Sequence, residues 1–270
     1  MTPSISAIII TKNEADMIVN CLETLRWCNE ALVIDNESSD TTAELAQRAG
    51  ARVVTAKGSF SDLRNEGLER CKADWILYID ADERVTPELA LEIQKTIAQT
   101  AASAFYVSRE NILYGYQQTH GGWGHDRVVR LFRRGALQKW EGIVHEHAVV
   151  EGETKALFHQ LIHLTHRNVI DGLLKTSDWT PMEAHMLYES KIPPVTGLTV
   201  VRKGVMEVVR RLILKRGWQD GQAGWMESLI QSINRALVYI QVWELQQQPP
   251  IAQRYQDMEA KIAADWKKTR

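Results

Sequence analysis

The chain has 270 residues, 44% of them hydrophobic, which is enough to bury one substantial core and a smaller appended unit without disulfide or metal cross-links. Its 32 basic and 34 acidic residues nearly cancel, so the composition argues against nucleic acid as a partner. No leader-like segment and no apolar run of membrane-spanning length is present, and the three cysteines lack a paired spacing. These features predict a cytoplasmic protein.

Short apolar runs alternate with helical patterns over the first hundred residues, a rhythm that predicts crossover helices and a mostly parallel sheet. The expected fold class is therefore α/β. Gly50 is expected to end one helix, Thr41 and Glu44 have the spacing of a capping box, and Pro87 suits the first turn of a helix that begins at Thr86. Strands are expected at residues 6–10, 31–35, 52–55, 75–80, 105–108 and 128–132.

Two prolines, Pro193 and Pro194, predict a boundary between a catalytic domain over residues 1–195 and a helical region over residues 196–270. The first expected helix of that region is amphipathic, with apolar residues on one face and basic residues mostly on the other. Such a helix, followed by Trp218, Trp225 and Trp243, predicts either docking on an anionic membrane surface or packing against protein, including a homodimer.

The strand expected at residues 75–80 ends in a group of acids that includes Asp80 and Asp82. Because side chains two apart on a strand share a face, these two carboxylates are expected to converge on one cation. Carboxylates are hard oxygen ligands, and Mg²⁺ or Mn²⁺ bound to them could bridge two phosphates of a ligand. A pair of aspartates with this spacing is common, however, and a solvated turn or a helix cap is the competing interpretation.

The wider sequence resembles the family 2 glycosyltransferases, which have the GT-A (nucleotide-diphospho-sugar transferase) fold. Four motifs in the expected order carry the resemblance, at residues 10–14, 33–40, 64–65 and 78–83. The subgroup of lipopolysaccharide core β-glucosyltransferases is the most similar, because further motifs recur in its order at residues 130–134 and 144–146, His163 and Lys175.

The resemblance implies roles for individual residues. Asp80 is expected nearer to the nucleotide, Asp82 as a direct metal ligand and His163 as a further ligand that completes the metal shell. For His163, packing under the acceptor site is an equally good interpretation. For Asp40 a helix cap, and for Arg64 a structural ion pair, are equally good interpretations. The residues expected to contact the nucleotide are Thr11, Asn13, Glu14 and Asp35, with Asp40 and Arg64 as secondary contacts.

An inverting transfer also needs a general base that removes the proton of the acceptor hydroxyl. Glu146 is the favoured candidate and Asp126 the alternative. Asp126 could instead form a structural pair with Arg127 or Arg130.

The resemblance implies a metal-dependent inverting transfer of a hexose, such as glucose from UDP-glucose, to a saccharide hydroxyl of a lipopolysaccharide-core or other cell-envelope glycan or glycolipid. It also implies a location in the cytoplasm or on the inner face of the cell membrane. A sugar-phosphate nucleotidyltransferase is the first alternative, but the glycine-rich loop of those enzymes is missing after the first strand. A haloacid-type phosphatase fits poorly at Arg84, and a non-catalytic membrane-associated adaptor is the remaining alternative.

Overall fold

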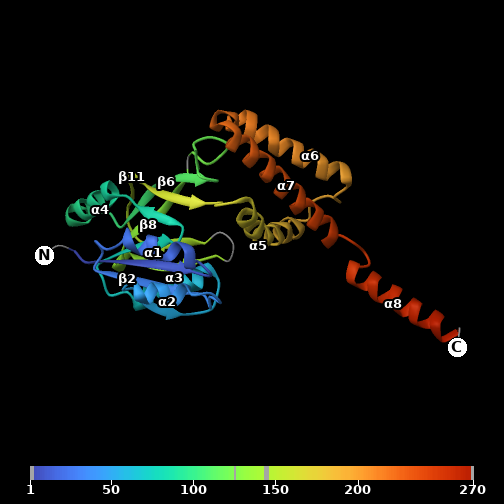
Figure 1. The fold of residues 1–270 in the computed structure, drawn as a ribbon, viewed down its shortest axis with the longest axis horizontal. Coiled ribbons are helices and arrows are strands. Elements are labelled where there is room, and N and C mark those ends of the chain that lie inside the picture. Colours follow the sequence, from blue (N-terminus) through green and yellow to red (C-terminus); the bar gives the residue numbers. More distant parts are fainter. Residues whose placement is uncertain (1–2, 125, 143–145, 269–270) are drawn as a thin grey trace. The chain divides into compact units, whose positions relative to one another are not determined.

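The computed structural model describes residues 3–124, 126–142 and 146–268. Within them the chain forms two compact units, which we describe separately: a sheet unit over residues 1–119 and 123–165, and a helical unit over residues 120–122 and 166–270 (Figure 1). The division falls before residue 195, the predicted boundary. Helix α5 (Val169–Glu189) belongs to the helical unit because its Ala184 joins a small core with Val238 of α7 (Gly221–Leu245).

The sheet has two halves with different strand directions. The strands of the first half, in the order β3-β2-β1-β4, are parallel, while β8 is antiparallel to both β4 and β6. Beyond β6, β11 pairs parallel to it and β5 antiparallel to β11, while the short β7 pairs antiparallel to β6. The α/β class is thus confirmed: the first half of the sheet is parallel as predicted, and the antiparallel pairings involve β8, β7 and β5. The strands are β1 (Ile5–Thr11), β2 (Glu30–Asp35), β3 (Arg52–Thr55), β4 (Trp75–Asp80), β5 (Glu83–Val85), β6 (Ala104–Leu113), β7 (Tyr116–Gln118), β8 (Arg127–Arg133) and β11 (Thr154–Thr165).

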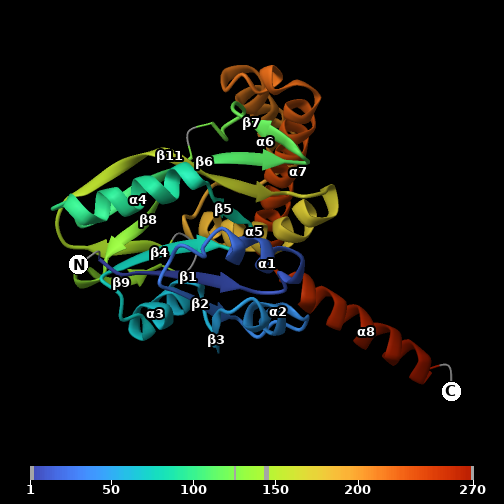
Figure 2. The ribbon, with the colours of Figure 1, turned by 60° about the vertical axis from the view of Figure 1, so that its left-hand side comes forward.

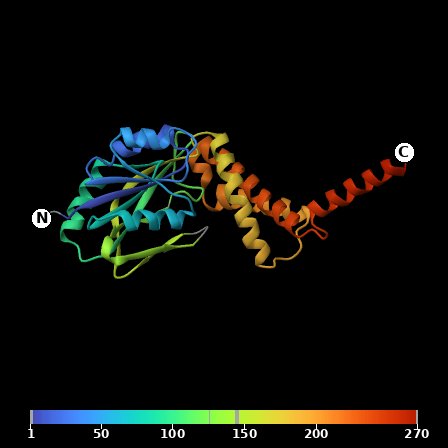
Figure 3. The same cartoon turned by 90° about the horizontal axis from the view of Figure 1, so that it is seen from below.

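Elements cover both faces of this sheet (Figures 2 and 3). Helices α1 (Ala15–Glu23), α2 (Thr42–Arg48) and α4 (Pro87–Gln99) pack on one face. The other face carries α3 (Phe60–Arg70) and the two-stranded ribbon of β9 (Leu137–Glu141) and β10 (His147–Val150). Strand alternation decides which face each side chain joins. On β4, Trp75 and Leu77 join the α1 face and Ile76 and Tyr78 the α3 face, so Asp80 continues the row on the α3 face.

Two of the three predicted helix signals are confirmed. Gly50 follows α2 with φ +91°, and Thr86 caps α4 by accepting a bond from the backbone N–H of Leu89 at 3.2 Å. The capping box at Thr41 is wrong, because its side chain makes no cap bond. Asp40 accepts a bond from the Thr42 N–H at 3.0 Å instead.

The helical unit consists of α5, α6 (Gly197–Val208), a π-helical turn (Val209–Leu214), a 3-10 turn (Gly217–Asp220), α7 and α8 (Ile251–Lys268). The tip of the loop after β7 also belongs to this unit, since His120 bonds Asp220 at 2.9 Å and the Gly121 N–H bonds the Lys215 carbonyl at 2.9 Å. No helix in the described part of the chain is both long and apolar enough to cross a membrane.

Candidate functional site

The carboxyl ends of three neighbouring parallel strands meet at one edge of the sheet. In the strand register, Thr11 at the end of β1 pairs with Asp35 at the end of β2, and Ile10 pairs with Asp80 at the end of β4. Glu14 lies three positions after the end of β1, as the N-cap residue of α1. Open α/β sheets bind their ligands at this edge. Three of the acids predicted from the sequence are therefore brought to a single place.

The Asp35 side is held rigidly by hydrogen bonds. Asp35 is only 3% exposed and accepts bonds from the Thr11 hydroxyl at 3.3 Å and the Ser38 N–H at 3.0 Å. Asn13 has a positive φ of 57° and accepts a bond from the Ser39 N–H at 2.8 Å, while its own N–H donates to the Ser38 hydroxyl at 2.9 Å. These bonds join the loops after β1 and β2 into one wall of the site.

Asp40 acts as a helix cap. It accepts bonds from the N–H groups of Ala15, in the first turn of α1, and Thr42, in the first turn of α2. Partial burial acts to raise the pKa of Asp40, but the bonds from Thr42 and Ala15 outweigh it and leave the pKa below its usual value. The Glu14 N–H also bonds the Thr42 hydroxyl, at 2.8 Å. The capping interpretation of Asp40 is thus the one that the geometry shows.

Asp80 lies between two arginines on the α3 face. Arg64 approaches one carboxylate oxygen at 3.4 Å, and Arg130 pairs with the other. Burial acts to raise the pKa of Asp80, but Arg130 and Arg64 outweigh it and hold the pKa well below its usual range. The guanidinium of Arg64 also lies over the rings of Trp140 and Tyr78, at 4.7 and 5.5 Å from their centroids.

Both arginines retain capacity to donate hydrogen bonds. The buried Nε groups of Arg64 and Arg130 have no acceptor among the residues that the structure describes. Because a guanidinium has five N–H donors and binds phosphate well, this side of the site suits an anionic ligand.

Glu83 contacts several residues of the site at once, and the sequence analysis did not identify it as a site residue. Its side chain is fully buried, and one carboxylate oxygen lies 2.6 Å from Arg130 and 3.3 Å from Arg109. The other oxygen accepts the Asp80 N–H at 3.0 Å. The signal in the sequence was the presence of charged residues in the middle of two strands, Arg109 on β6 and Arg130 on β8.

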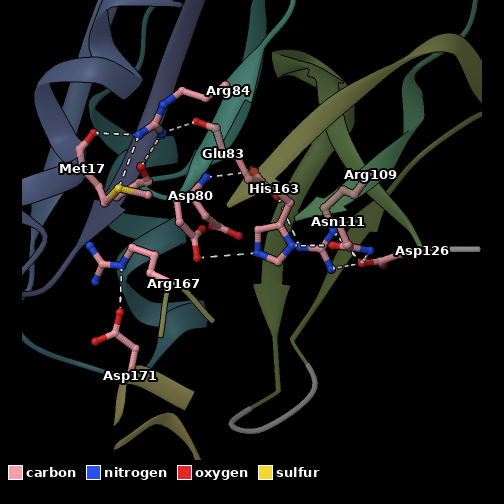
Figure 4. A network of polar contacts seen from close by, with 12 residues as sticks. Met17, Asp80, Glu83, Arg84, Arg109, Asn111, Asp126, His163, Arg167 and Asp171 are labelled. Carbon is pink, nitrogen blue, oxygen red and sulfur yellow. Dashed lines mark hydrogen bonds and ion pairs between the residues drawn. The ribbon is translucent and has the colours of Figure 1, made fainter. Parts of the chain in front are cut away.

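Asp126, the alternative base, is held by Arg109. Two bonds of 2.7 and 2.8 Å join the guanidinium to one carboxylate oxygen of Asp126, and Asn111 donates to the same oxygen at 3.3 Å (Figure 4). The predicted structural role of Asp126 is therefore supported, but its expected partners, Arg127 and Arg130, are wrong.

The same Asn111 orients His163. The Asn111 amide nitrogen donates to the Trp123 carbonyl at 2.9 Å, so its oxygen faces His163 Nδ1, 2.7 Å away (Figure 4). An amide oxygen only accepts, hence Nδ1 carries the proton. Nε2 of His163 then faces a carboxylate oxygen of Asp82, at 3.6 Å.

The geometry around Asp82 differs from the sequence argument. Strand β4 ends at Asp80, and Asp82 lies in the turn that leads into β5, so strand alternation does not place the two carboxylates together. Asp80 faces the arginines and Asp82 faces His163. The described residues contain no group of three or more histidine, cysteine or acidic side chains that is positioned to hold a metal ion.

Glu146 joins the site through Arg64. Its carboxylate lies 3.4 Å from the same Arg64 nitrogen that approaches Asp80. Residues 144 and 145 of its motif lie outside the described residues. Glu146, the favoured base, and Asp80 therefore contact the same guanidinium, that of Arg64.

The acids at the ends of the parallel strands, beside the buried Arg64 and Arg130, lie where open α/β sheets bind their ligands. The chain belongs to glycosyl transferase family 2, whose family model matches residues 6–159, more than half of its length. It is thus a glycosyltransferase. The family match favours glycosyl transfer over the nucleotidyltransferase, phosphatase and adaptor alternatives.

The chain is similar to two relatives that are named as glycosyltransferases and, more distantly, to one solved structure. A lipopolysaccharide core biosynthesis glycosyltransferase, LpsC of Rhizobium meliloti, is 27% identical over 89% of this chain and 92% of its own length. An uncharacterized glycosyltransferase of Rickettsia bellii is 40% identical, over 36% of this chain and about a third of its own length (34%). Among solved structures, glucosyl-3-phosphoglycerate synthase of Mycobacterium tuberculosis, in complex with Mn²⁺, UDP and phosphoglyceric acid, aligns with a TM-score of 0.45 and 16% identity, covering 71% of this chain and 80% of that one.

Proposed function

We propose that the chain transfers a hexose from a nucleotide-sugar, with UDP-glucose as the expected donor, to a saccharide hydroxyl of a cell-envelope glycan or glycolipid. The observation that carries the proposal is the meeting of Asp35, Glu14 and Asp80 at one sheet edge, beside the arginines Arg64 and Arg130. The acids on the β1 and β2 side suit the hydroxyls of a nucleoside, and the arginines suit the diphosphate. The name of the Rhizobium meliloti relative supports a lipopolysaccharide-core acceptor.

The donor set around His163 fits a divalent cation. With the proton on Nδ1, the lone pair of Nε2 faces the Asp82 carboxylate, and two such acceptors 3.6 Å apart call for a cation or a proton between them. Two ligands that each lie about 2.1 Å from one cation are themselves about 3 to 3.5 Å apart. Asp82 and His163 would hold Mg²⁺ or Mn²⁺, which would neutralise charge on the diphosphate. The oxygens of Asp80 pair with arginines, so Asp80 would approach the cation only if those pairs rearranged.

Glu146 would act as the base of an inverting transfer. Arg64 lies within 3.4 Å of both Glu146 and Asp80, which places this carboxylate beside the proposed donor site. Asp126 would serve as a structural partner of Arg109.

Calorimetric titration tests the donor site. UDP, UDP-glucose, GDP and ADP are titrated into the intact chain with and without Mn²⁺. We expect uridine nucleotides to bind most tightly in the presence of Mn²⁺. Asp35→Asn should weaken UDP binding with or without metal, whereas Asp82→Asn should remove only the gain from Mn²⁺. Glu44→Gln, on the exposed side of α2, is the matched control. Equal affinity for all nucleotides, or no effect of Asp35→Asn, would contradict the proposal.

A further inference from the structure

The hairpin of α6, the π-helical turn and α7 has an unusual interior. The buried residues of α6 are Gly204 and Glu207. In the first half of α7 the buried residues are Gly224, Glu227 and Ser228. In a helix pair that is surrounded by water, apolar side chains normally fill the contact and polar ones face outward.

The two helices approach closely through small residues. The Ser232 hydroxyl donates to the Gly204 carbonyl at 2.8 Å. A Cβ added at Gly204 would lie 3.4 Å from that hydroxyl and 3.8 Å from the Ala236 side chain. The contact is therefore a close fit with little apolar area.

A polar network lies beside this contact, around Glu207 and Glu227. Glu207 accepts bonds from Arg210 at 2.9 Å and from Arg211 at 2.7 Å. Arg211 also bonds the Gln231 side chain at 3.3 Å, which in turn donates to Glu227 at 2.8 Å. The hydrogen bonds that hold the hairpin together thus lie inside it.

Many apolar residues of the hairpin face outward instead, although Leu212 and, in the second half of α7, Val238 and Val242 are buried. On α6 and the π-helical turn the exposed ones recur every three or four positions and form one stripe, from Leu198, which is 78% exposed, to Ile213, which is 60% exposed. Exposed apolar residues follow along α7 as well. We call this set the apolar stripe: Leu198, Val201, Val205, Val209 and Ile213 on the first arm, and Trp225, Leu229, Ile233 and Ile240 on the second. An exposed apolar set of this size marks a contact surface.

The charge around the stripe is positive. Residues 197–216 contain six basic side chains and one acid, Glu207, which is buried. Arg202, Lys215 and Arg216 are exposed. Partial burial lowers the pKa of Lys215, and the nearby positive charges of Arg210 and Arg211 lower it further, which indicates crowded positive charge at this end of the hairpin.

Tryptophans stand at the same end. Trp218 and Trp225 are about half exposed, close in sequence to Lys215 and Arg216. Tryptophan is enriched where apolar and polar media meet, and a helix with an apolar stripe and basic flanks is the type that lies in a membrane interface. A second copy of the chain is a poorer occupant, because a symmetric contact would bring the two basic clusters together.

We propose that the α6–α7 hairpin binds the surface of an anionic phospholipid bilayer, with the apolar stripe among the headgroups and acyl ends and with Arg202, Lys215 and Arg216 on the lipid phosphates. The hairpin lies on the bilayer and does not cross it. This inference does not depend on the sugar donor.

Vesicle sedimentation with the intact chain tests the proposal. We expect binding to vesicles of equal parts phosphatidylcholine and phosphatidylglycerol, weak or no binding to phosphatidylcholine alone, and loss of binding at high salt. Replacing Arg202, Lys215 and Arg216 together by glutamine should weaken binding on the order of 100-fold, since each basic residue near such a surface contributes about a factor of five.

Two further variants test whether vesicle binding is due to the α6–α7 hairpin or to non-specific attraction of basic residues. Val205→Asn combined with Ile213→Asn should weaken binding by about 10-fold or more, because two apolar side chains would no longer insert. Both residues are exposed, so the unfolding midpoint should not change. The matched charge control replaces Arg26, Arg48 and Lys139, exposed basic residues of the sheet unit, by glutamine and should leave binding unchanged.

Three results would overturn the proposal. The first is no binding to phosphatidylglycerol vesicles at low salt, and the second is an equal loss of binding in the control triple variant. The third is a dimer in analytical ultracentrifugation that the Val205→Asn, Ile213→Asn variant dissociates, together with no vesicle binding, which would assign the stripe to a second copy.

Discussion

Replacement of Arg130 by methionine tests whether the buried charge network holds the sheet unit together. The Arg130 side chain is 4% exposed and the Glu83 side chain 0%, and Arg130 also pairs with Asp80. Removing one partner of a buried ion pair leaves an uncompensated charge and costs about 3 to 5 kcal/mol. Glu83 keeps Arg109 and the Asp80 N–H in the variant, so we expect the lower end, about 3 kcal/mol.

The assay is urea unfolding of the intact chain, with the midpoint and slope of each transition recorded. Adding Glu83→Gln to Arg130→Met removes the carboxylate charge that has lost its Arg130 partner. The free energy of unfolding should then rise by at least about 1 kcal/mol above that of Arg130→Met, a coupling expected only for groups in direct contact. Arg48→Met is the control, because its pair with Glu44 is exposed and should contribute less than about 1 kcal/mol. Two results would contradict this reasoning. One is a loss of less than about 1 kcal/mol in the free energy of unfolding of Arg130→Met. The other is a loss in the double variant that equals the sum of the losses in the two single variants.

Three further predictions concern packing, thiols and the base. Gly67→Ala would place a Cβ 2.6 Å from a β1 side chain and should destabilise the sheet unit by about 1 to 3 kcal/mol in the same urea assay; an unchanged midpoint would contradict the tight packing of α3. Cys21 is fully buried, and burial raises its pKa to about 12, so it should not react with a thiol reagent at pH 8 until the chain unfolds; rapid labelling of Cys21 in the native chain would show that it is accessible. Glu146→Gln should retain nucleotide binding and lose glycosyl transfer in a product assay, whereas Asp126→Asn should lose stability; the reverse pattern would make Asp126 the base.

The local sequence pattern was sufficient to predict the strands and helix ends on which the site is built. The predicted strands at residues 52–55 and 75–80 are observed with the same bounds, and Gly50 ends its helix as expected. Periodicity, caps and strand-end acids depend on residues close in sequence, so they can be read without the fold. The order of the motifs was likewise sufficient for the family.

Pairings between distant residues came only from the tertiary structure. Arg109 and Asp126 are 17 positions apart and meet because β6 and β8 pair antiparallel, and nothing local distinguishes this pairing from a parallel one. Arg130 of β8 meets Glu83 of β5 across 47 positions, although these two strands are not neighbours in the sheet. The partners of the candidate site were therefore beyond prediction from local pattern.

The helical unit shows the same division most clearly. The sequence determined that residues 197–216 form a basic amphipathic helix, but amphipathicity only separates two faces and does not say which one is covered. The tertiary structure decided that Gly204 and Glu207 face α7 while Val205 and Ile213 face outward, because small side chains and a closed hydrogen-bond network let the helices approach more closely than the branched apolar residues would.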